Sequence, residues 1–338
     1  MALDYYRDPA SVAKKIHVPL YDEVLGRIKS RYPRGGRSLF EREMSRLQAV
    51  YDIAISRTNF IRDLVRLLDG MHPFYWRLVE IEFDRSKVRE AIKCVSKARK
   101  VSSMLWEKYR FRLMAAEDKR ELLKISSEAR GRILSPYRKC RKSFELLRSL
   151  VVFIQKLPAI DTSLPTVMVA GAPSTGKSTI VRNVSRAAPK IAQYPFTTTT
   201  IHVGHYTTGD LKIQVIDTPG LLDRDPSEMN PIERRAVAAL TELEGVILYL
   251  LDPTETAYMS LERQYKLLLN VRRLVPRKPV YIAINKIDQA QRTSLDRARK
   301  IAELAVEKNL AGGYMLIKGI NPADARAAIR EAIKLITK

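Results

Sequence analysis

Residues 171–178 read Gly-Ala-Pro-Ser-Thr-Gly-Lys-Ser and fit the pattern G-x-x-x-x-G-K-[ST], which constrains the fold more than any other segment of the chain. The segment follows an apolar run at residues 166–170 and precedes a helix-forming stretch. In this context backbone N–H groups surround phosphate oxygens, Lys177 reaches the outer phosphates and Ser178 offers its hydroxyl to Mg²⁺. The predicted phosphate-binding residues are Ala172, Pro173, Ser174, Thr175, Gly176, Lys177, Ser178 and Thr179.

The second half of the chain alternates short apolar runs with helical stretches. The runs lie at residues 166–170, 211–216, 246–251, 279–284 and 314–317. This alternation predicts an α/β P-loop domain with a mostly parallel six-stranded sheet and helices on both faces. A turn at residues 208–210 predicts one antiparallel hairpin, and residues 322–337 predict a closing amphipathic helix.

The first half repeats apolar side chains at helical spacing between residues 38 and 155. Breaks near residues 70–73, at 84–86 and at Ser135-Pro136 predict about four long helices packed as an all-α bundle. Residues 31–37 are expected to form a flexible basic loop. A chain of 338 residues is long enough for two domains, and we place them at 1–160 and 161–338.

The charge of the chain is strongly positive, with 60 Lys and Arg against 37 Asp and Glu and a net charge of +23. The first 160 residues carry 35 of these basic side chains and 19 of the acidic ones. Such a field attracts polyanions, so nucleic acid is the leading partner and an anionic membrane surface the lesser one. The candidate RNA-binding residues are Arg31, Arg34, Arg37, Lys93, Lys97, Arg138, Arg141 and Lys142. Each basic run could instead be a solvated helix face.

Other sequence features concern the cellular environment. No segment has the length and apolar character of a membrane span, and the chain shows neither a secretory signal nor a prenylation cysteine. We therefore expect a cytoplasmic protein. Cys94 and Cys140 lack metal-ligand spacing and are expected to be reduced structural cysteines.

Two further motifs end apolar runs. Asp217-Thr-Pro-Gly220 could orient Mg²⁺ through the carboxylate and sense a γ-phosphate through the Gly220 N–H, although an Asp-initiated turn is the simpler interpretation of this motif alone. The second motif is Asn285-Lys-Ile-Asp288. Asp288 would accept hydrogen bonds from the N1 and N2 edge of guanine, Asn285 would tie the loop to the phosphate loop, and Lys286 would cover the base. Open α/β sheets bind ligands at the carboxyl ends of their strands, where both motifs are expected.

Residues 194–200, Tyr-Pro-Phe-Thr-Thr-Thr-Thr, lie between the phosphate-loop helix and the hairpin, where a switch threonine would contact Mg²⁺ and the γ-phosphate. We favour Thr198 over Thr197 for this role, whereas Thr199 and Thr200 fit a strand start. The predicted catalytic residues are Lys177, Thr198 and Gly220, and the predicted Mg²⁺ ligands are Ser178, Thr198 and Asp217.

Taken together, these motifs resemble the Obg-related GTPases. The segments at residues 248–258, 157–161 and 72–75 further resemble the nucleolar GTP-binding protein family, which matures the large ribosomal subunit, in a short, archaeal-like form. The resemblance implies a Ras-like GTPase domain behind a helical bundle, with GTP and Mg²⁺ as ligands. It also implies ribosomal RNA or ribosomal proteins of the large subunit or its precursor as partners, and we expect the free protein to be a monomer.

The sequence departs from this pattern at three places. Leu221 stands where Ras-like proteins have the glutamine that orients the attacking water, so hydrolysis should be slow or need a partner. Ser174 replaces an asparagine, which puts potassium-assisted hydrolysis in doubt. Lys318-Gly319 replaces a Ser-Ala pair, so this last guanine contact would come from the backbone of Lys318.

Three functions are compatible with these features. The first is a GTP-hydrolysing switch that docks on a ribosomal precursor through its basic helical domain. The second is an RNA-binding placeholder that holds GTP with little hydrolysis, which Leu221 allows. The third is a stress-signalling or membrane-surface GTPase, which the charge permits but the lack of a lipid anchor disfavours.

Overall fold

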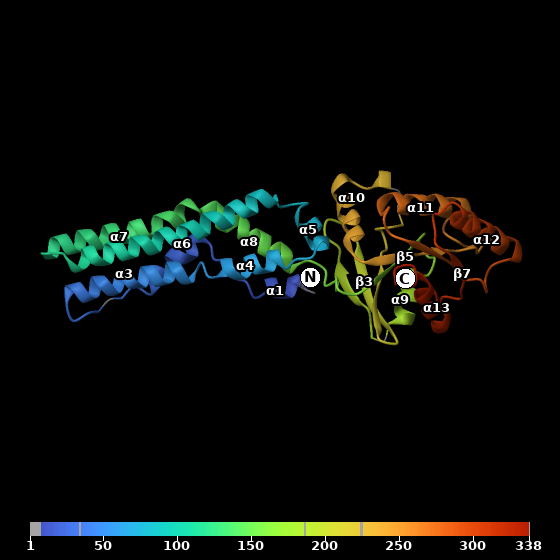
Figure 1. Cartoon of the computed structure of the whole chain (residues 1–338), viewed down its shortest axis with the longest axis horizontal. Coiled ribbons are helices and arrows are strands. Elements are labelled where there is room, and N and C mark those ends of the chain that lie inside the picture. Colours follow the sequence, from blue (N-terminus) through green and yellow to red (C-terminus); the bar gives the residue numbers. More distant parts are fainter. Residues whose placement is uncertain (1–7, 34, 186, 224–225, 338) are drawn as a thin grey trace. The chain divides into compact units, whose positions relative to one another are not determined.

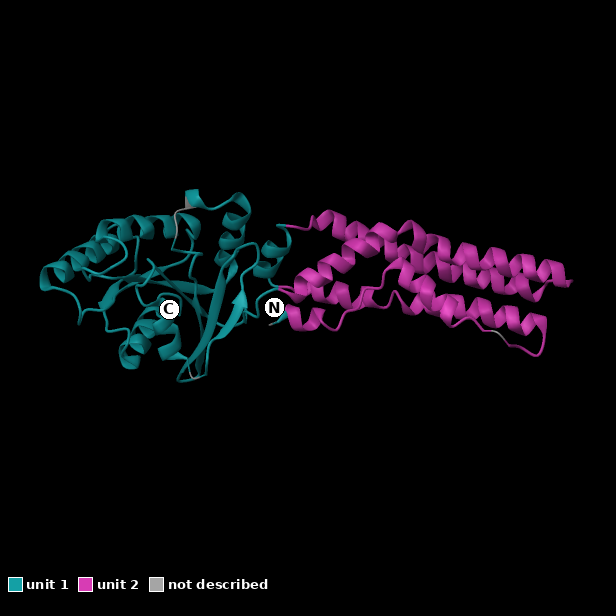
Figure 2. Ribbon diagram, turned by 180° about the vertical axis from the view of Figure 1, so that it is seen from behind, with its two compact units in different colours: residues 1–8, 72–81, 157–338 teal, residues 9–71, 82–156 magenta. Residues whose placement is uncertain are grey.

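The computed structural model describes residues 8–33, 35–185, 187–223 and 226–337. They form two compact units (Figure 2). One, here called the helical unit, comprises residues 9–71 and 82–156, and the other, the α/β unit, comprises residues 72–81 and 157–338 together with Asp8. The expected boundary at residue 160 therefore does not account for residues 72–81, which belong with the α/β unit.

The helical unit is built from helices, several of which are long (Figure 1). Its helices are α1 (Pro9–Ala13), α2 (Tyr21–Ser30), α3 (Leu39–Ser56), α4 (Phe60–Asp69), α6 (Arg85–Met114), α7 (Lys119–Lys139) and α8 (Arg141–Gln155). Side-chain caps begin the two longest: Asp84 accepts from the Ser86 and Lys87 N–H groups, and Asp118 accepts from the Glu121 N–H. Buried residues of α2, α3, α6 and α7, among them Leu47 and Leu113, form one core.

Two sequence expectations for this unit are wrong. Ser135-Pro136 does not separate two helices, because α7 continues to Lys139. The missing N–H of Pro136 leaves the Arg132 carbonyl without its usual helical donor, and the Ser135 hydroxyl donates to that carbonyl at 3.0 Å instead. Cys94 and Cys140 are not free thiols, since their Cα atoms lie 5.9 Å apart and a disulfide joins them.

The α/β unit contains one seven-stranded sheet in the order β2-β3-β4-β1-β5-β6-β7. The strands are β1 (Thr166–Gly171), β2 (Lys190–Gln193), β3 (Thr200–Thr208), β4 (Leu211–Asp217), β5 (Gly245–Leu251), β6 (Val280–Ile284) and β7 (Tyr314–Leu316). The mostly parallel sheet and the β3–β4 hairpin are confirmed, because among the strands that the structure describes only β2–β3 and β3–β4 pair antiparallel. The expected six strands are one too few. Strand β2 was missed because it lies mostly exposed and shows no apolar run.

Helices cover both faces of the sheet (Figure 1). They are α9 (Lys177–Val184), α10 (Pro231–Ala238), α11 (Leu261–Leu274), α12 (Arg292–Glu307) and α13 (Pro322–Ile333), with the 3-10 turns η1 (Pro226–Glu228) and η2 (Ala239–Glu242). Buried side chains of α9 and α13 share a core with those of β1, β4 and β5. In the described part of the chain no helix meets the length and hydropathy needed to cross a bilayer.

Helix α5 (Pro73–Val79) completes this unit, although both of its ends continue into the helical unit. The Tyr75 side chain is fully buried, and its hydroxyl donates to the Ile160 carbonyl at 2.6 Å and accepts from the Ile160 N–H at 3.1 Å. Burial raises the pKa of the Tyr75 phenol, because the ionised form would lie in an apolar environment. The tyrosine therefore stays neutral and fixes α5 to the entry of the sheet.

Candidate nucleotide-binding site

The phosphate-binding loop connects β1 to α9, as the motif requires. Its backbone has positive φ at Gly171, Ser174 and Gly176, with values of 140°, 64° and 99°. A Cβ atom at Gly176 would lie only 2.6 Å from the Asn285 Nδ2 atom, so no larger residue fits at this position. Within the loop, the Thr175 hydroxyl donates to the Ala172 carbonyl at 2.9 Å, which closes the loop.

Lys177 lies buried at the start of α9, with its ammonium group inside the loop. The Nζ atom donates to the Gly171 carbonyl at 2.8 Å and to the Ala172 carbonyl at 2.9 Å. It also lies 3.4 Å from the Asp223 Oδ2 atom, and both side chains are less than a tenth exposed. Asp223 was not among the predicted site residues, because only the fold brings it to a lysine 46 positions earlier. A buried cation with one carboxylate neighbour is available to a phosphate that displaces that neighbour.

Ser178 and Asp217 meet where a divalent cation was predicted. The Ser178 hydroxyl donates to the Asp217 Oδ2 atom at 2.5 Å. The Asp217 side chain is fully buried, and its Oδ1 atom has no hydrogen-bond partner among the described residues. A buried carboxylate oxygen without a donor and an adjacent hydroxyl fit a hard cation such as Mg²⁺. The described residues contain no cluster of three or more acidic, His or Cys ligands, so phosphate and water oxygens would have to complete the coordination.

His202 is a neighbour of this pair that the sequence did not indicate. It lies on β3 opposite Asp217, and its Nδ1 atom is 3.5 Å from the Asp217 Oδ2 atom. That nitrogen is buried, and no residue in the described part of the chain forms a hydrogen bond with it. The antiparallel register of the hairpin places it there, and this register could have been anticipated from the turn at residues 208–210.

The threonines at positions 197, 198 and 199 differ in how they lie relative to the Asp217-Thr-Pro-Gly220 segment. Gly220 has φ 70°, and a Cβ atom there would lie 2.8 Å from the Thr199 hydroxyl oxygen. Thr199 is thus the threonine next to Gly220, whereas Thr198, the residue that we favoured, is exposed in the preceding bend. Thr197 is held locally, because its hydroxyl donates to the Tyr194 carbonyl at 3.0 Å.

Asn285 joins three loops at the other end of the site. Its Nδ2 atom donates to the Thr175 carbonyl at 2.8 Å, and its Oδ1 atom accepts from the Gly319 N–H at 2.6 Å. The side chain is buried, so both bonds are shielded from water. The loop after β6 is therefore attached to the phosphate-binding loop and to the loop after β7.

The remaining residues predicted for base recognition lie around Asn285. Lys286 adopts φ 55°, and its Nζ atom donates to the Asp252 Oδ2 atom at 2.5 Å, which holds its stem in a defined position. Asp288 lies exposed in the turn that follows. The Lys318 N–H, which we expected to be available to a base, donates to the Asp324 Oδ2 atom at 2.9 Å. Asp252, which also accepts from the Thr254 N–H and hydroxyl, and Asp324 were not among the predicted site residues.

The predicted RNA-binding residues do not form one group. Arg31 and Arg37 flank α2 and α3, and Arg34 lies outside the described residues. Lys93 and Lys97 are exposed on α6, whereas Arg138 lies in the last turn of α7 and Arg141 and Lys142 begin α8. A helix break at Cys140 separates Arg138 from Arg141 and Lys142, so the three residues do not share one helix. The Arg141 guanidinium pairs with Asp22 at 2.9 Å and with Glu145 at 3.4 Å, which reduces its availability to a phosphate.

Comparisons with known proteins agree with this architecture. A family model described as the NOG1 N-terminal helical domain matches residues 15–161, and a second, described as nucleolar GTP-binding protein 1 (NOG1), matches residues 231–288. Nucleolar GTP-binding protein 1 of Caenorhabditis elegans is 34% identical over 272 residues, which are 80% of this chain and 38% of that protein. The Saccharomyces cerevisiae protein of the same name is 29% identical over 288 residues, which are 83% and 44% of the two chains. This chain thus spans about two fifths of the length of these relatives.

A solved structure is also similar. It is a Plasmodium falciparum crystal structure assigned to nucleolar GTP-binding protein 1, with 30% identity and a TM-score of 0.47, and the match covers 53% of this chain and 90% of the other.

The expected cytoplasmic location is contradicted by these comparisons. The relatives from Caenorhabditis elegans, Saccharomyces cerevisiae and Dictyostelium discoideum are named as nucleolar proteins. Our expectation rested on the lack of a secretory signal and of a membrane span. Neither feature separates the cytoplasm from the nucleolus, because proteins of both compartments lack a secretory signal and need no membrane span.

Proposed function

Since this chain belongs to the nucleolar GTP-binding protein 1 family, we propose that it binds and hydrolyses GTP and assists assembly of the large ribosomal subunit, docking on ribosomal RNA through its helical unit. The observation that carries the GTPase part is the convergence of Lys177, Asp217 and Asn285 at the carboxyl edge of one sheet. Each of these side chains is buried and held by contacts to a neighbouring loop. Preorganised polar groups of this kind bind a ligand without reorganising when it arrives.

Each loop has a separate task in the proposed reaction. The phosphate-binding loop would surround the β- and γ-phosphates, with the Lys177 ammonium on their oxygens in place of the Asp223 carboxylate. Ser178 and Asp217 would hold Mg²⁺, which neutralises charge on the phosphates when bound. Asp288 would select guanine, because a carboxylate accepts from both the N1 and N2 donors of that base.

Hydrolysis by the chain alone is expected to be slow. Leu221 is fully buried and has no polar atom that could orient the attacking water. This observation favours a second candidate function, that of an RNA-bound placeholder which holds GTP with little turnover. Phosphate release measured with and without large ribosomal subunits distinguishes the two functions. The switch requires faster release in the presence of subunits, whereas the placeholder requires the same low rate in both.

Docking is tested by sedimentation of the full chain with large ribosomal subunits in GTP, in GDP and without nucleotide. We expect the protein in the particle fraction to depend on the nucleotide, because the nucleotide state would time docking or release. The Lys177→Ala variant is the control, since it should lose this dependence with the nucleotide. No association with particles in any of the three states would refute the ribosomal role and leave the GTPase assignment untouched.

A further inference from the structure

One face of α6 combines cationic and apolar side chains that are all exposed. Its members recur at intervals of three, four, seven or eight residues, which places them on one side of the helix. This set, called here the α6 stripe, consists of Lys93, Lys97, Lys100, Met104, Lys108 and Phe111. The opposite side of α6 carries the buried residues of the helix, such as Val95 and Leu113, so the stripe is not a misplaced core face.

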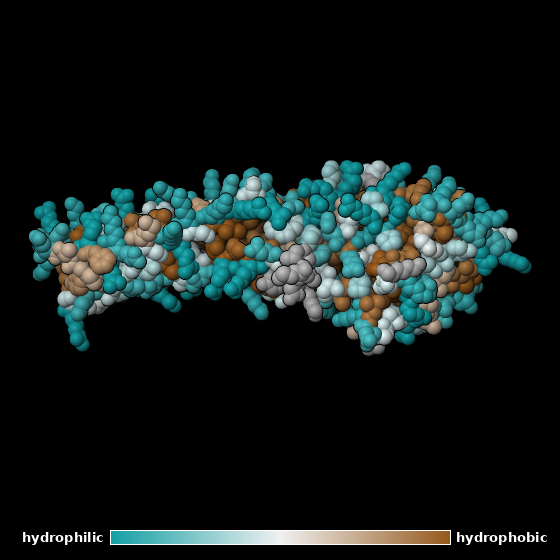
Figure 3. Space-filling view, viewed as in Figure 1, coloured by the Kyte–Doolittle hydropathy of each residue, from teal (hydrophilic) through white to brown (hydrophobic). Residues whose placement is uncertain are grey.

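The apolar members of the α6 stripe are largely exposed to solvent. Met104 is 61% exposed and Phe111 is 66% exposed. The surface of the helical unit is mostly hydrophilic in the view of Figure 3, with separate hydrophobic areas among the charged side chains. An exposed apolar patch rimmed by polar side chains marks an interaction site, whereas single exposed apolar residues are ordinary. Met104 and Phe111 lie about two turns apart on one helix face that also carries four lysines, so they are not isolated exposures.

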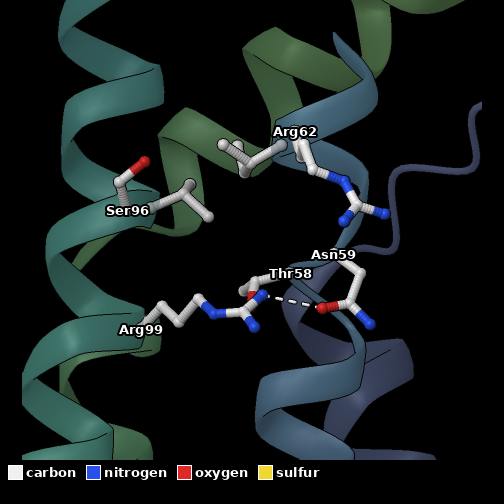
Figure 4. Close-up of a pocket in the computed structure, with 7 residues that line it drawn as sticks. Thr58, Asn59, Arg62, Ser96 and Arg99 are labelled. Carbon is white, nitrogen blue, oxygen red and sulfur yellow. Dashed lines mark hydrogen bonds between the residues drawn. The ribbon is translucent and has the colours of Figure 1, made fainter. Parts of the chain in front are cut away.

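The lysines of the stripe form no ion pair among the described residues, whereas two arginines of the same helix contact other side chains of the protein. Within the described part of the chain none of the four lysines forms an ion pair with a carboxylate. By contrast, the Arg99 guanidinium donates to the Asn59 Oδ1 atom at 2.7 Å across a pocket between α6 and α4, as Figure 4 shows. Arg112 lies 3.5 Å from Glu128 and stacks over the Tyr109 ring. The outward lysines therefore remain available to an external anion.

The chemistry of the stripe fits one class of polyanion. Lys93 to Lys108 spans about 22 Å along the helix axis, enough for several successive phosphates. A phenylalanine ring and a methionine thioether offer nothing to a phosphate, but they pack against the flat face of a base. Base faces are hidden inside a duplex and open in loops, bulges and single strands.

We propose that the α6 stripe binds RNA at unpaired nucleotides, with its lysines on the phosphates and Phe111 stacked on a base. The inference rests on the proposed function and gives it a location and a type of RNA. Met104 would pack against a second base along the same strand. The acidic residues Glu90 and Glu107 follow the same spacing, three residues from Lys93 and from Met104, and so limit where a phosphate can lie along the stripe.

The test uses the full chain and three probes of equal nucleotide content: an unstructured RNA strand, a hairpin with a large loop, and a fully paired duplex. The strand and the hairpin should bind more tightly than the duplex. Phe111→Ala should weaken binding of the strand about tenfold and leave duplex binding unchanged, because one stacked base is lost. Phe111→Trp should retain the affinity, and bound RNA should quench its fluorescence.

A pair of matched double variants tests the lysines. Lys100→Ala with Lys108→Ala should weaken binding of all three probes and reduce the salt slope by about one unit or more. Lys300→Ala with Lys308→Ala, which removes one exposed lysine of α12 and the exposed lysine that follows its last residue, should change neither quantity. Circular dichroism and nucleotide affinity of every variant should match those of the unaltered chain.

Three results would overturn the inference. They are equal loss of strand and duplex binding in Phe111→Ala, equal effects of the two lysine pairs, and Phe111-dependent binding to anionic phospholipid vesicles without RNA binding. The failures remain distinguishable. Full-chain sedimentation with ribosomal subunits that persists in the stripe variants refutes the stripe alone, whereas stripe-dependent RNA binding without any particle binding refutes the ribosomal role.

Discussion

The side chains that most affect chemistry at the phosphate-binding loop are two buried carboxylates. Asp217 and Asp223 each have an Oδ1 atom without a hydrogen-bond partner in the part of the chain that the structure describes, and both lie among groups that would meet phosphate or metal. Leaving a buried acceptor without a donor is destabilising by about 1–3 kcal/mol. We therefore attribute these two carboxylates to ligand binding and not to packing of the core. The effect of Asp223 on nucleotide affinity is the easier one to measure separately.

We predict that Asp223→Asn increases nucleotide affinity. The Asp223 carboxylate lies 3.4 Å from the Lys177 Nζ atom, so an incoming phosphate has to displace it. The amide keeps the volume and removes the charge, and affinity for GDP and GTP should rise by about tenfold, or about 1.4 kcal/mol. Titration calorimetry measures the change, with the exposed Glu228→Gln as a control of the same charge change in the neighbouring η1 turn. An unchanged or weaker affinity in Asp223→Asn would show that the contact does not compete with nucleotide.

Asp288 provides a second prediction at this scale. Because it is exposed and not needed for packing, its substitution should leave the fold intact. Asp288→Asn replaces one of two acceptors with a donor, so affinity for guanine nucleotides should fall by about 2 kcal/mol or more. Competition between GTP and ATP measures it, with Asp296→Asn on α12 as the control. If ATP displaces GTP equally well from the unaltered chain, the assignment of guanine is incorrect.

At the scale of single elements, α5 begins at an unusual cap. The N-cap residue His72 accepts a hydrogen bond from the Phe74 N–H through its Nδ1 atom at 3.2 Å, which requires an unprotonated ring. Burial lowers the pKa of His72, and Lys278 lowers it further, while Glu242 partly opposes both. The cap is therefore formed at neutral pH and sensitive to acid.

The sign of this pH dependence follows from linkage. The unfolded imidazole takes up a proton near its ordinary pKa of 6.5, and the folded one does so only at lower pH. The stability that His72 contributes is complete above pH 6.5 and is lost as the pH falls through the folded pKa. We predict a steeper fall in Tm between pH 7 and pH 5 for the unaltered chain than for His72→Asn, in which the cap does not titrate. The difference should reach about 1 kcal/mol. Parallel Tm profiles for the two proteins would exclude the cap as the cause.

The molecule as a whole has a discontinuous α/β unit. Residues 72–81 leave the helical unit, form α5 and return to it, so the α/β unit is interrupted by residues 82–156. Four side chains of α5 are fully buried, namely Phe74, Tyr75, Leu78 and Val79. A fragment of residues 160–338, which the sequence alone would present as an independent GTPase domain, lacks all of them.

We predict that the fragment 160–338 is less stable than a chain in which a Gly-Ser linker joins residues 72–81 directly to residues 157–338. Burial of four large side chains and the Tyr75 hydrogen bonds should make a difference of at least about 3 kcal/mol. Urea unfolding measures it, and Tyr75→Phe in the linked chain isolates the hydroxyl. Equal midpoints for the fragment and the linked chain would mean that α5 does not stabilise this unit.

The features foreseen from the sequence are those encoded by neighbouring residues. The phosphate-binding loop needs glycine, lysine and serine at fixed spacing, and the buried strands need runs of apolar side chains, so both are readable without a structure. The same dependence explains the errors. Strand β2 has no apolar run, and α7 continues through Pro136 because a hydroxyl replaces the missing donor.

The tertiary structure was needed wherever a function depends on residues distant in the sequence. It brings Asp223 to Lys177 and Asp252 to Lys286, and it assigns α5 to the α/β unit. Local propensity contains no information about such pairs, because the energy of each contact exists only after the sheet has formed and excluded water from it. The chemistry of the nucleotide site could therefore be predicted from short motifs. The residues that contact those motifs from other parts of the chain could be identified only from the packing of the folded protein.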